Sequence, residues 1–374
     1  MSRRSALVTG GAVLIGSHLV DLLIAEGWRV RVLDNLEPQT HAAGRPRWLN
    51  PRAEVMIGDV RDRETLPTAL EGVDTVFHLA AYGGYMTEIA KFFDVNCVGT
   101  ALLLETIRDR NLPVRKVVVA SSQAVYVEGA VSCPHHGLQF PGRREGVAMA
   151  AGHFDVACPL CGGESAPAST PETAPLGGET VYAMTKVAQE KLVLAWSRQA
   201  GIPAVALRYA CTYGPRQSVF NPYTGVIAVF CTRLLNGLPP VLYEDGRQTR
   251  DLCHVSDVAR ANLLAATSDR LDGQAVNIGT GRATSIRRLA ELLAELLEVD
   301  LPPELAGAFR PGEMRALTPD VGLAAVAGFR ALVSLEEGLS GYVAWIRELG
   351  RIDERFAESL RRLRLAGAVQ PVAR

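Results

Sequence analysis

The chain has 374 residues, and its 39 Lys and Arg residues nearly balance its 40 Asp and Glu residues, for a formal net charge of −1. Hydrophobic residues make up 48% of the chain and charged residues 21%, which is typical of a globular protein and excludes a largely disordered one. The neutral total argues against a nucleic-acid-binding protein, and the lack of a run of about 18 apolar residues argues against a membrane span. We therefore expect a soluble, cytoplasmic protein that binds neither nucleic acid nor membrane.

The first third of the chain alternates short apolar runs with amphipathic helical patterns. Helical spacing predicts helices near residues 17–27 and 96–109. Apolar runs predict strands near residues 5–10, 28–34, 53–59, 74–81 and 115–122. Strands that are apolar nearly throughout and separated by helices indicate a parallel sheet covered on both faces. The sequence therefore predicts an α/β fold with a Rossmann-type, doubly wound parallel sheet.

This alternation stops over residues 127–178, which are rich in Gly, Pro, His, Cys and Ser. A structureless stretch of that length inside a compact domain is uncommon, so we expect an insertion that has its own means of ordering. The alternation resumes with a helix near 180–201 and a strand near 202–210. Further helices are predicted near 222–236, 255–267, 284–297 and 335–348.

We divide the chain into three parts on this pattern. Residues 1–205 are predicted to form the first domain, with the insertion inside it, and residues 206–349 a smaller α/β substrate-binding domain. Residues 350–374 are predicted to form a short surface helix with a frayed end.

A glycine-rich turn, TGGAVLIG at residues 9–16, lies between the first predicted strand and the first helix. Glycines at such a turn allow a close backbone approach, and the helix N-terminus faces a pyrophosphate. Asp34 ends the second strand, where a carboxylate accepts hydrogen bonds from a ribose and repels a 2′-phosphate. The pattern predicts a dinucleotide site that prefers NAD to NADP. Val13 stands where this fingerprint has its middle glycine, and glycines as ordinary turn residues are the alternative interpretation.

Tyr182 and Lys186 form a Tyr-x-x-x-Lys motif on a predicted helix, which places both side chains on one face. A nearby ammonium and a nicotinamide cation favour the phenolate, so this pair can supply a general base with a lowered pKa. Ser122 ends the strand near 115–122, at the sheet edge where ligands of open parallel sheets gather. Its hydroxyl can share a hydrogen bond with the substrate oxygen that Tyr182 deprotonates.

These motifs, together with GDVRD at residues 58–62, HLAA at 78–81 and Asn96, resemble the extended short-chain dehydrogenase/reductase family over about residues 6–345. More narrowly, they are similar to its nucleotide-sugar epimerase/dehydratase branch. The resemblance implies that NAD stays bound through turnover, that Ser122, Tyr182 and Lys186 are the catalytic residues, and that Asn96 supports the active-site helix. The cofactor-binding residues that it implies are Gly10, Ala12, Val13, Leu14, Ile15, Gly16, Asp34, Asn35, Asp59, Val60, Leu79, Ala80, Ala81, Asn96, Tyr182 and Lys186.

The same resemblance implies a homodimer, formed through the helix after Asn96 and the helix with Tyr182. The apolar positions compatible with such a four-helix interface are Leu102, Leu103, Leu192 and Leu194, which are equally compatible with the core.

Later motifs resemble the loops that hold a sugar nucleotide in this branch, and they imply that Arg250 and Arg310 bind the diphosphate. Arginine suits this task because its guanidinium pairs with two phosphate oxygens at once. Cys211 stands where the branch has a substrate-contacting asparagine, and cysteine is a poorer hydrogen-bonding partner. The implied substrate-binding residues are Ser122, Cys211, Asn221, Arg250 and Arg310.

The residues after Ser122 help to choose the reaction. Nucleotide-sugar 4,6-dehydratases have Asp-Glu there for acid–base elimination, whereas this chain has Gln123 and Ala124. Neither side chain can move a proton, so dehydration is disfavoured and chemistry that needs only hydride transfer remains. We therefore expect 4-epimerisation through a transient 4-keto sugar.

The insertion contains a candidate zinc site. The odd total of seven cysteines disfavours a disulfide framework. Cys133 and His136 form a Cys-x-x-His pair, and Cys158 and Cys161 form a Cys-x-x-Cys pair. Four such ligands suit a closed tetrahedral zinc, which would order a loop too small to build its own core. The alternatives are His135 or His153 as the fourth ligand, and free thiols or a disulfide in place of a metal.

The insertion, together with NPYTGV at 221–226 and EDGRQTRD at 244–251, resembles bacterial dTDP-L-rhamnose 4-epimerases, which interconvert dTDP-L-rhamnose and dTDP-6-deoxy-L-talose. The alternatives are a UDP-hexose 4-epimerase and an epimerase or reductase of another dTDP-deoxysugar. In a different class, the alternative is a non-catalytic NAD-binding regulatory protein.

Overall fold

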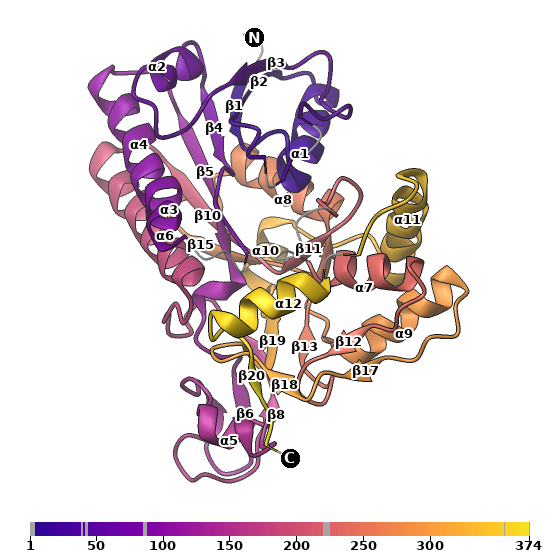
Figure 1. The fold of residues 1–374 in the computed structure, drawn as a ribbon. Coiled ribbons are helices and arrows are strands. Elements are labelled where there is room, and N and C mark those ends of the chain that lie inside the picture. The colour runs from indigo at the N-terminus through magenta and orange to yellow at the C-terminus, as the bar shows by residue number, and fades with distance from the viewer. Residues whose placement is uncertain are drawn as a thin grey trace.

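A seven-stranded parallel sheet is the centre of the fold in the computed structural model, which describes residues 4–38, 40–41, 44–84, 88–219, 225–354 and 356–373 (Figure 1). Every pair of neighbouring strands is parallel. In spatial order the strands are β3 (Glu54–Ile57), β2 (Arg29–Asp34), β1 (Ser5–Thr9), β4 (Thr75–His78), β5 (Lys116–Ser122), β10 (Ala204–Tyr209) and β15 (Ala275–Ile278). The predicted doubly wound α/β fold is confirmed.

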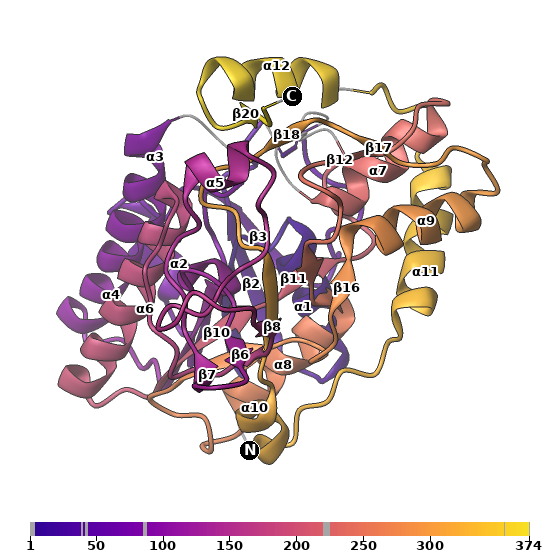
Figure 2. The ribbon, with the colours of Figure 1, turned by 90° about the horizontal axis from the view of Figure 1, so that it is seen from below.

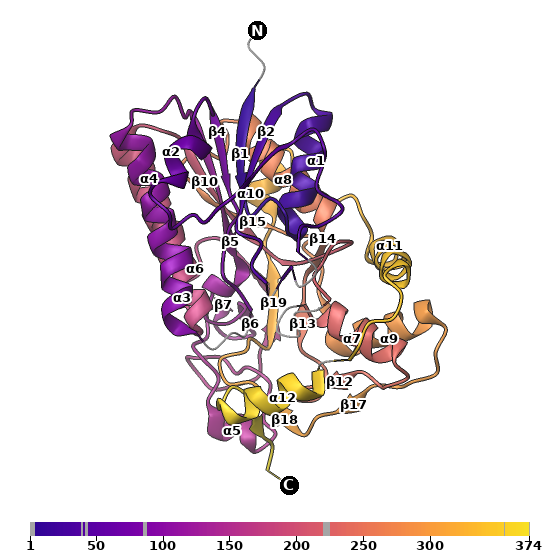
Figure 3. The ribbon, with the colours of Figure 1, turned by 45° about the horizontal axis from the view of Figure 1, so that its top comes forward.

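Helices cover both faces of this sheet (Figure 3). Because side chains alternate along a strand, Ala6 and Val8 of β1 face one layer, whereas Leu7 faces the other. The first layer contains α1 (Leu14–Ala25) and α8 (Val255–Thr267), and the second contains α2 (Thr65–Leu70), α4 (Gly99–Asp109) and α6 (Val181–Ala200). The helix predicted from Asn96 begins differently: residues Asp94–Val98 form a π-helical turn that joins α3 (Ile89–Phe93) to α4.

The predicted second domain also contributes to this sheet. Both α8 and β15 come from residues beyond 205, so a border at that position does not separate two contiguous units. The remaining residues form a smaller part whose core is built by α7 (Val226–Leu235), α9 (Ile286–Leu297) and α11 (Leu335–Glu348). Short strands β11 (Cys211–Tyr213) and β14 (Leu252–His254) join this part to the sheet.

The insertion projects beyond the sheet and has little regular structure (Figure 1). It contains β6 (Val131–Cys133), β7 (Gly137–Gln139) and β8 (Ala166–Pro167) in one small sheet, and the short α5 (Gly146–Ala150). Its last strand, β9 (Ser169–Thr170), pairs with β19 (Ala316–Pro319), and β19 pairs with β13 (Thr249–Arg250). The insertion is therefore linked through β19 to β13, the strand that ends with Arg250.

The C-terminal tail is more ordered than its sequence indicates. The predicted helix is present as α12 (Phe356–Leu365), but β20 (Gln370–Pro371) then pairs with β18 (Ala308–Phe309), as Figure 2 shows. Leu363 and Val369 are buried against Ala308, so the expectation of a frayed end was wrong up to residue 373. In the described ranges, helices with the length and apolarity needed to cross a bilayer are absent.

Candidate active site

The glycine-rich turn is compact because two of its glycines leave no room for a side chain. Gly10 has φ +68°, and a Cβ there would lie 2.9 Å from Cα of Ala80. A Cβ on Gly16 would overlap the carbonyl oxygen of Gly10. Val13 has an ordinary extended backbone and forms the N-cap of α1. The turn therefore accommodates a valine at this position without backbone strain.

Asp34 fixes the turn from the end of β2. Its carboxylate accepts hydrogen bonds from the backbone N–H of Ala12 and of Leu36, both at 2.9 Å. Nε2 of His41 lies 4.0 Å from the same carboxylate. Burial lowers the pKa of His41, although the Asp34 charge opposes this shift. These backbone contacts fix the position of the Asp34 carboxylate, the group that the sequence predicts to bind a ribose.

Asp59 is held beside Asn35 at the adjacent strand end. It accepts a hydrogen bond from Nδ2 of Asn35 at 2.9 Å and pairs with the guanidinium of Arg61 at 2.7 Å. The hydrogen bond from Arg61 lowers the pKa of Asp59 to about 2, so this carboxylate is ionised at neutral pH.

A cavity of about 1040 Å³ runs from the turn to the active-site helix. The predicted cofactor residues that line it are Gly10, Val13, Leu14, Ile15, Gly16, Asp34, Asn35, Asp59, Val60, Leu79, Ala80, Ala81, Tyr182 and Lys186. Ala12 and Asn96 are not among the described lining residues. Sequence reasoning missed His41 and Trp48, which also line the cavity, because they lie in a stretch without periodicity.

Tyr182 and Lys186 are placed by the first turns of α6, whose N-terminus is capped by Thr180. Nζ of Lys186 donates to the carbonyl of Ala120 and to Oε1 of Gln189, both at 2.8 Å, and it lies 5.9 Å from the Tyr182 ring centroid. Burial lowers the pKa of Lys186 to about 7.

Burial also raises the pKa of Tyr182, and its hydrogen bond with Ser122 only partly opposes that shift. We expected a lowered pKa from the neighbouring ammonium together with a nicotinamide cation. The protein by itself does not produce one, because the loss of water around the phenol outweighs the other contributions. The three predicted catalytic residues are nevertheless brought together.

Asn96 connects the strand-end loop to the active-site helix. Its Oδ1 accepts from the backbone N–H of Tyr82 at 2.8 Å, and its Nδ2 donates to the Tyr82 carbonyl and to Oγ1 of Thr185, both at 2.9 Å. Thr185 lies on α6 between Tyr182 and Lys186. This arrangement fits the predicted support of the helix rather than a contact with a bound dinucleotide.

The predicted substrate residues are only partly assembled in one place. Cys211 lines the cavity, where Nε2 of Gln123 donates to its Sγ at 2.9 Å. Asn221 lies outside the described residues.

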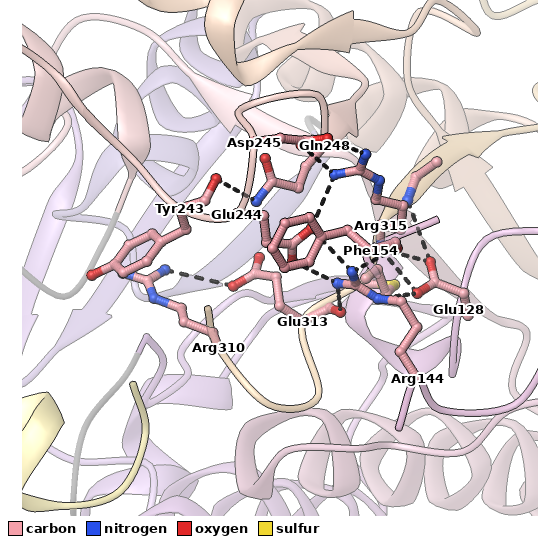
Figure 4. A network of polar contacts seen from close by, with 12 residues as sticks. Glu128, Arg144, Phe154, Tyr243, Glu244, Asp245, Gln248, Arg310, Glu313 and Arg315 are labelled. Atoms are coloured by element: carbon pink, nitrogen blue, oxygen red, sulfur yellow. Dashed lines mark hydrogen bonds and ion pairs between the residues drawn. The ribbon is translucent and has the colours of Figure 1, made fainter. Parts of the chain in front are cut away.

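Arg250 and Arg310 both pair with the carboxylate of Glu313. Figure 4 shows Arg310 beside Glu313. The distance to a Glu313 oxygen is 2.7 Å from Nη2 of Arg250 and 3.6 Å from Nη1 of Arg310. Glu313 was missed, although it lies in the same short motif as Arg310.

The four predicted metal ligands form one cluster in the insertion, with their ligand atoms all within 4.8 Å of one another. Nδ1 of His136 lies 3.6 Å from Sγ of both Cys133 and Cys158. Sγ of Cys133 lies 3.9 Å from Sγ of Cys161, which is too far for a disulfide. His136, rather than His135 or His153, is the histidine in this cluster.

Both pairs of ligands sit on tight turns. Gly137 and Gly162 follow them with φ +64° and +67°, which a residue with a side chain adopts only with strain. The backbone N–H groups of His135 and Gly163 hydrogen bond to the cysteine sulfurs.

Known proteins are similar to this chain over most of its length. The model of the NAD dependent epimerase/dehydratase family matches residues 6–139 and 160–279, which leaves out the middle of the insertion. A dTDP-L-rhamnose 4-epimerase from Burkholderia thailandensis is 35% identical over 93% of this chain and 96% of its own. A UDP-glucose 4-epimerase from Mycolicibacterium smegmatis is 31% identical over 91% of this chain and 98% of its own.

Two solved structures share the fold closely. The UDP-glucose 4-epimerase of Thermotoga maritima with UDP-glucose is 32% identical, has a TM-score of 0.76, and is matched over 92% of this chain and 99% of that one. The Thermus thermophilus UDP-glucose 4-epimerase complex with NAD is 29% identical, with a TM-score of 0.71 over 93% and 100% of the two chains. The chain therefore belongs to the NAD dependent epimerase/dehydratase family of extended short-chain dehydrogenases/reductases, the group of enzymes that includes these nucleotide-sugar epimerases.

Proposed function

We propose that the protein is an NAD-dependent 4-epimerase of a nucleotide-activated deoxysugar, and that it interconverts dTDP-L-rhamnose and dTDP-6-deoxy-L-talose. The observation that carries this proposal is that Tyr182 and Lys186 line a cavity that begins at the glycine turn, and that Ser122 hydrogen bonds to Tyr182. The dTDP-L-rhamnose 4-epimerase of Burkholderia thailandensis, at 35% identity, supports the choice of sugar.

The residues around the cavity fit NAD. Gly10 and Gly16 form a turn that has no room for a Cβ, and the Asp34 side chain lies at the edge of this turn. Bound NAD would supply the acceptor and donor of the C4 hydride. In the proposed reaction Tyr182 removes the proton of the C4 hydroxyl, while Ser122 hydrogen bonds to the same oxygen. The 4-keto sugar then turns in the cavity, and Tyr182 returns the proton after hydride has reached the other face.

Lys186 supports this proton transfer from the buried side of the helix. Burial lowers its pKa to about 7, so Lys186 is partly protonated at neutral pH, and the positive charge of the protonated form beside the phenol favours the phenolate. Gln123 explains why the reaction stops at epimerisation. Its amide donates to Cys211, and it offers no carboxyl group for elimination at C5 and C6.

The experiment is a panel of dTDP-L-rhamnose, UDP-glucose and UDP-galactose, incubated with the purified protein and followed by NMR. A new dTDP-sugar with inverted C4 supports the proposal, whereas turnover of UDP-glucose alone favours the UDP-hexose alternative. Tyr182→Phe is expected to lose at least about 100-fold in kcat, the usual contribution of a general base. Denatured wild-type protein should release NAD or NADH, and its absence, with no turnover of any sugar, would favour the regulatory alternative.

We also propose that Cys133, His136, Cys158 and Cys161 bind a structural zinc ion. For ideal tetrahedral zinc, with Zn–S of about 2.3 Å and Zn–N of about 2.05 Å, the ligand atoms lie about 3.8 Å apart for two sulfurs and about 3.6 Å for sulfur and nitrogen. The distances of 3.9 and 3.6 Å agree with these values. All four positions are protein ligands, so the site is closed to substrate. Elemental analysis should find one zinc per chain, and much less in Cys158→Ser.

We propose that the protein is a homodimer, with an interface that differs in detail from the expected one. Leu102 and Leu103 are buried in the core and cannot contact a partner. The exposed apolar side chains on the same helical layer are Ile89, Phe93, Val98, Met184 and Leu192. Light scattering should give a mass twice that of the monomer, and the Phe93→Glu protein should have the mass of one monomer.

A further inference from the structure

A buried network of charged side chains joins the insertion to two loops of the smaller part (Figure 4). The insertion contributes Glu128, near its start, together with Arg144 and Asp155. The smaller part contributes Glu244 and Arg315. The side chains of Arg144, Glu128 and Glu244 have exposed fractions of 7%, 2% and 1%, so water does not screen these interactions.

Arg144 makes directional contacts with three different segments of the network. Its Nη1 and Nη2 donate to the two carboxylate oxygens of Glu244, at 3.0 and 2.8 Å. Nη2 also donates to the backbone carbonyl of Glu313 at 2.6 Å, and Nη1 to the carbonyl of Phe154 at 3.1 Å. One guanidinium thus ties the insertion to two loops that are far from it in the sequence.

Both of these loops hold Arg310. Glu244 follows Tyr243, whose ring lies 4.4 Å from the guanidinium carbon of Arg310. Glu313 accepts from Arg250 through its carboxylate while Arg144 holds its carbonyl. Arg144 therefore binds Glu313, which pairs with Arg310. It also binds Glu244, the residue next to the tyrosine whose ring contacts Arg310.

The backbone of Glu244 shows that this contact has a cost. Its φ is +54°, in the left-handed region that residues other than glycine, asparagine and aspartate rarely adopt. Such strain persists only where surrounding contacts determine the conformation. Here Arg144 and Arg315 both pair with the Glu244 carboxylate, at 2.8 and 3.0 Å.

We propose that Arg144 is a positioning residue for the nucleotide part of the substrate: it fixes the two loops that hold Arg250 and Arg310, and so the insertion sets the affinity for a nucleoside diphosphate. The inference rests on the proposed function, in which these two arginines bind the diphosphate. A lysine can replace this arginine only in part, because a single ammonium keeps the charge but cannot reach the carboxylate and both carbonyls in the planar geometry of a guanidinium.

The experiment measures the Kd of dTDP and of UDP for the NAD-loaded protein by calorimetry, with Arg144→Met and Arg144→Lys as variants. Arg143→Met is the matched control, because the Arg143 side chain is 53% exposed and pairs with Glu179 at a distance of 3.9 Å, outside the buried network. We expect the Kd to rise at least about 10-fold in Arg144→Met and by less in Arg144→Lys. Arg143→Met should stay within about 2-fold of wild type. Bound NAD per chain should be unchanged in all variants.

Kinetics separate positioning from a general loss of structure. With the sugar that wild type converts, KM should rise with the Kd while kcat stays within about 3-fold. If wild type binds dTDP or UDP and both Arg144 variants bind as tightly, the inference is wrong and the proposed function stands. If Arg144→Met is too unstable to purify, Arg144→Lys decides alone. If wild type binds neither diphosphate, the proposed function fails first, and the inference fails with it.

Discussion

Replacement of Gly129 by alanine tests how closely the insertion is packed against the smaller part. Gly129 lies at the start of the insertion, and a Cβ on it would lie 1.6 Å from the carbonyl oxygen of Ala316 and 3.3 Å from Cα of Leu317. Ordinary contacts are roughly 2 Å longer than the first of these distances. The obstacle is backbone of β19, which cannot rotate away as a side chain would.

The expected loss combines two effects. Overpacking of a well-packed site costs about 1–3 kcal/mol, and rigid backbone places this one near 3 kcal/mol. Displacement of Ala316 also weakens the hydrogen bonds that Glu128 accepts from the N–H groups of Arg315 and Ala316, at 2.9 and 3.3 Å. Hydrogen bonds to a charged group contribute about 1.5–3 kcal/mol each, so we expect a total of about 4–5 kcal/mol.

Thermal unfolding measures this loss. With an unfolding entropy of about 2.1 cal/mol/K per residue, a cooperative chain of 374 residues loses about 5–6 °C in Tm for that free energy. Gly142→Ala is the matched control, because nothing lies within 4 Å of its added Cβ and its φ is not positive. A Gly129→Ala protein with the Tm of the control would refute the packing described here.

Three further outcomes are expected. Removal of the metal with a strong chelator should make the insertion, residues 127–178, sensitive to limited proteolysis, and zinc should restore resistance; Cys97→Ser, outside the cluster, should behave as wild type. Asn96→Ala should destabilise the protein by about 1–3 kcal/mol in urea unfolding, because it removes the partner of the buried Tyr82 backbone groups and one of the hydrogen bonds of Thr185. It should also lower kcat more than it changes KM, and an unchanged kcat would contradict a supporting role. The pKa of Asp59 in the folded protein is about 2, below its usual value of 3.8, so the ionised carboxylate stabilises the fold fully above pH 3.8 and this stabilisation is lost as the pH falls towards 2. The free energy of unfolding of Asp59→Asn should therefore differ more from that of wild type at pH 6 than at pH 3. An equal difference at both pH values would count against the pair with Arg61.

Much of the fold and of the catalytic set could be predicted because both depend on local patterns. The strands of the sheet are apolar runs, and Tyr182 and Lys186 share a helix face through their spacing alone. The glycines of the turn were likewise recognisable, and Gly10 and Gly16 have the close backbone contacts that the pattern requires.

The rest depends on partners that are distant in the sequence. The pairing of β18 with β20 joins residues near 308 to residues near 370, and no local pattern in the tail indicates it. Leu102 and Leu103 fit a core or an interface equally well by spacing, and only packing decides between them. Arg144 lies in a segment without periodicity, so its contacts with Glu244 and Glu313 have no signal in the sequence.

The last strand of the central sheet also has a consequence for synthesis of the protein. β10 pairs with β5 on one side and with β15 on the other, but β15 is made about 65 residues later. Until residue 278 has left the ribosome, the apolar strand β10 has an open edge that can pair with another chain. A nascent chain that stalls between β10 and β15 should therefore depend on chaperones, and deletion from β15 onward should yield an aggregating fragment instead of a folded dinucleotide-binding domain.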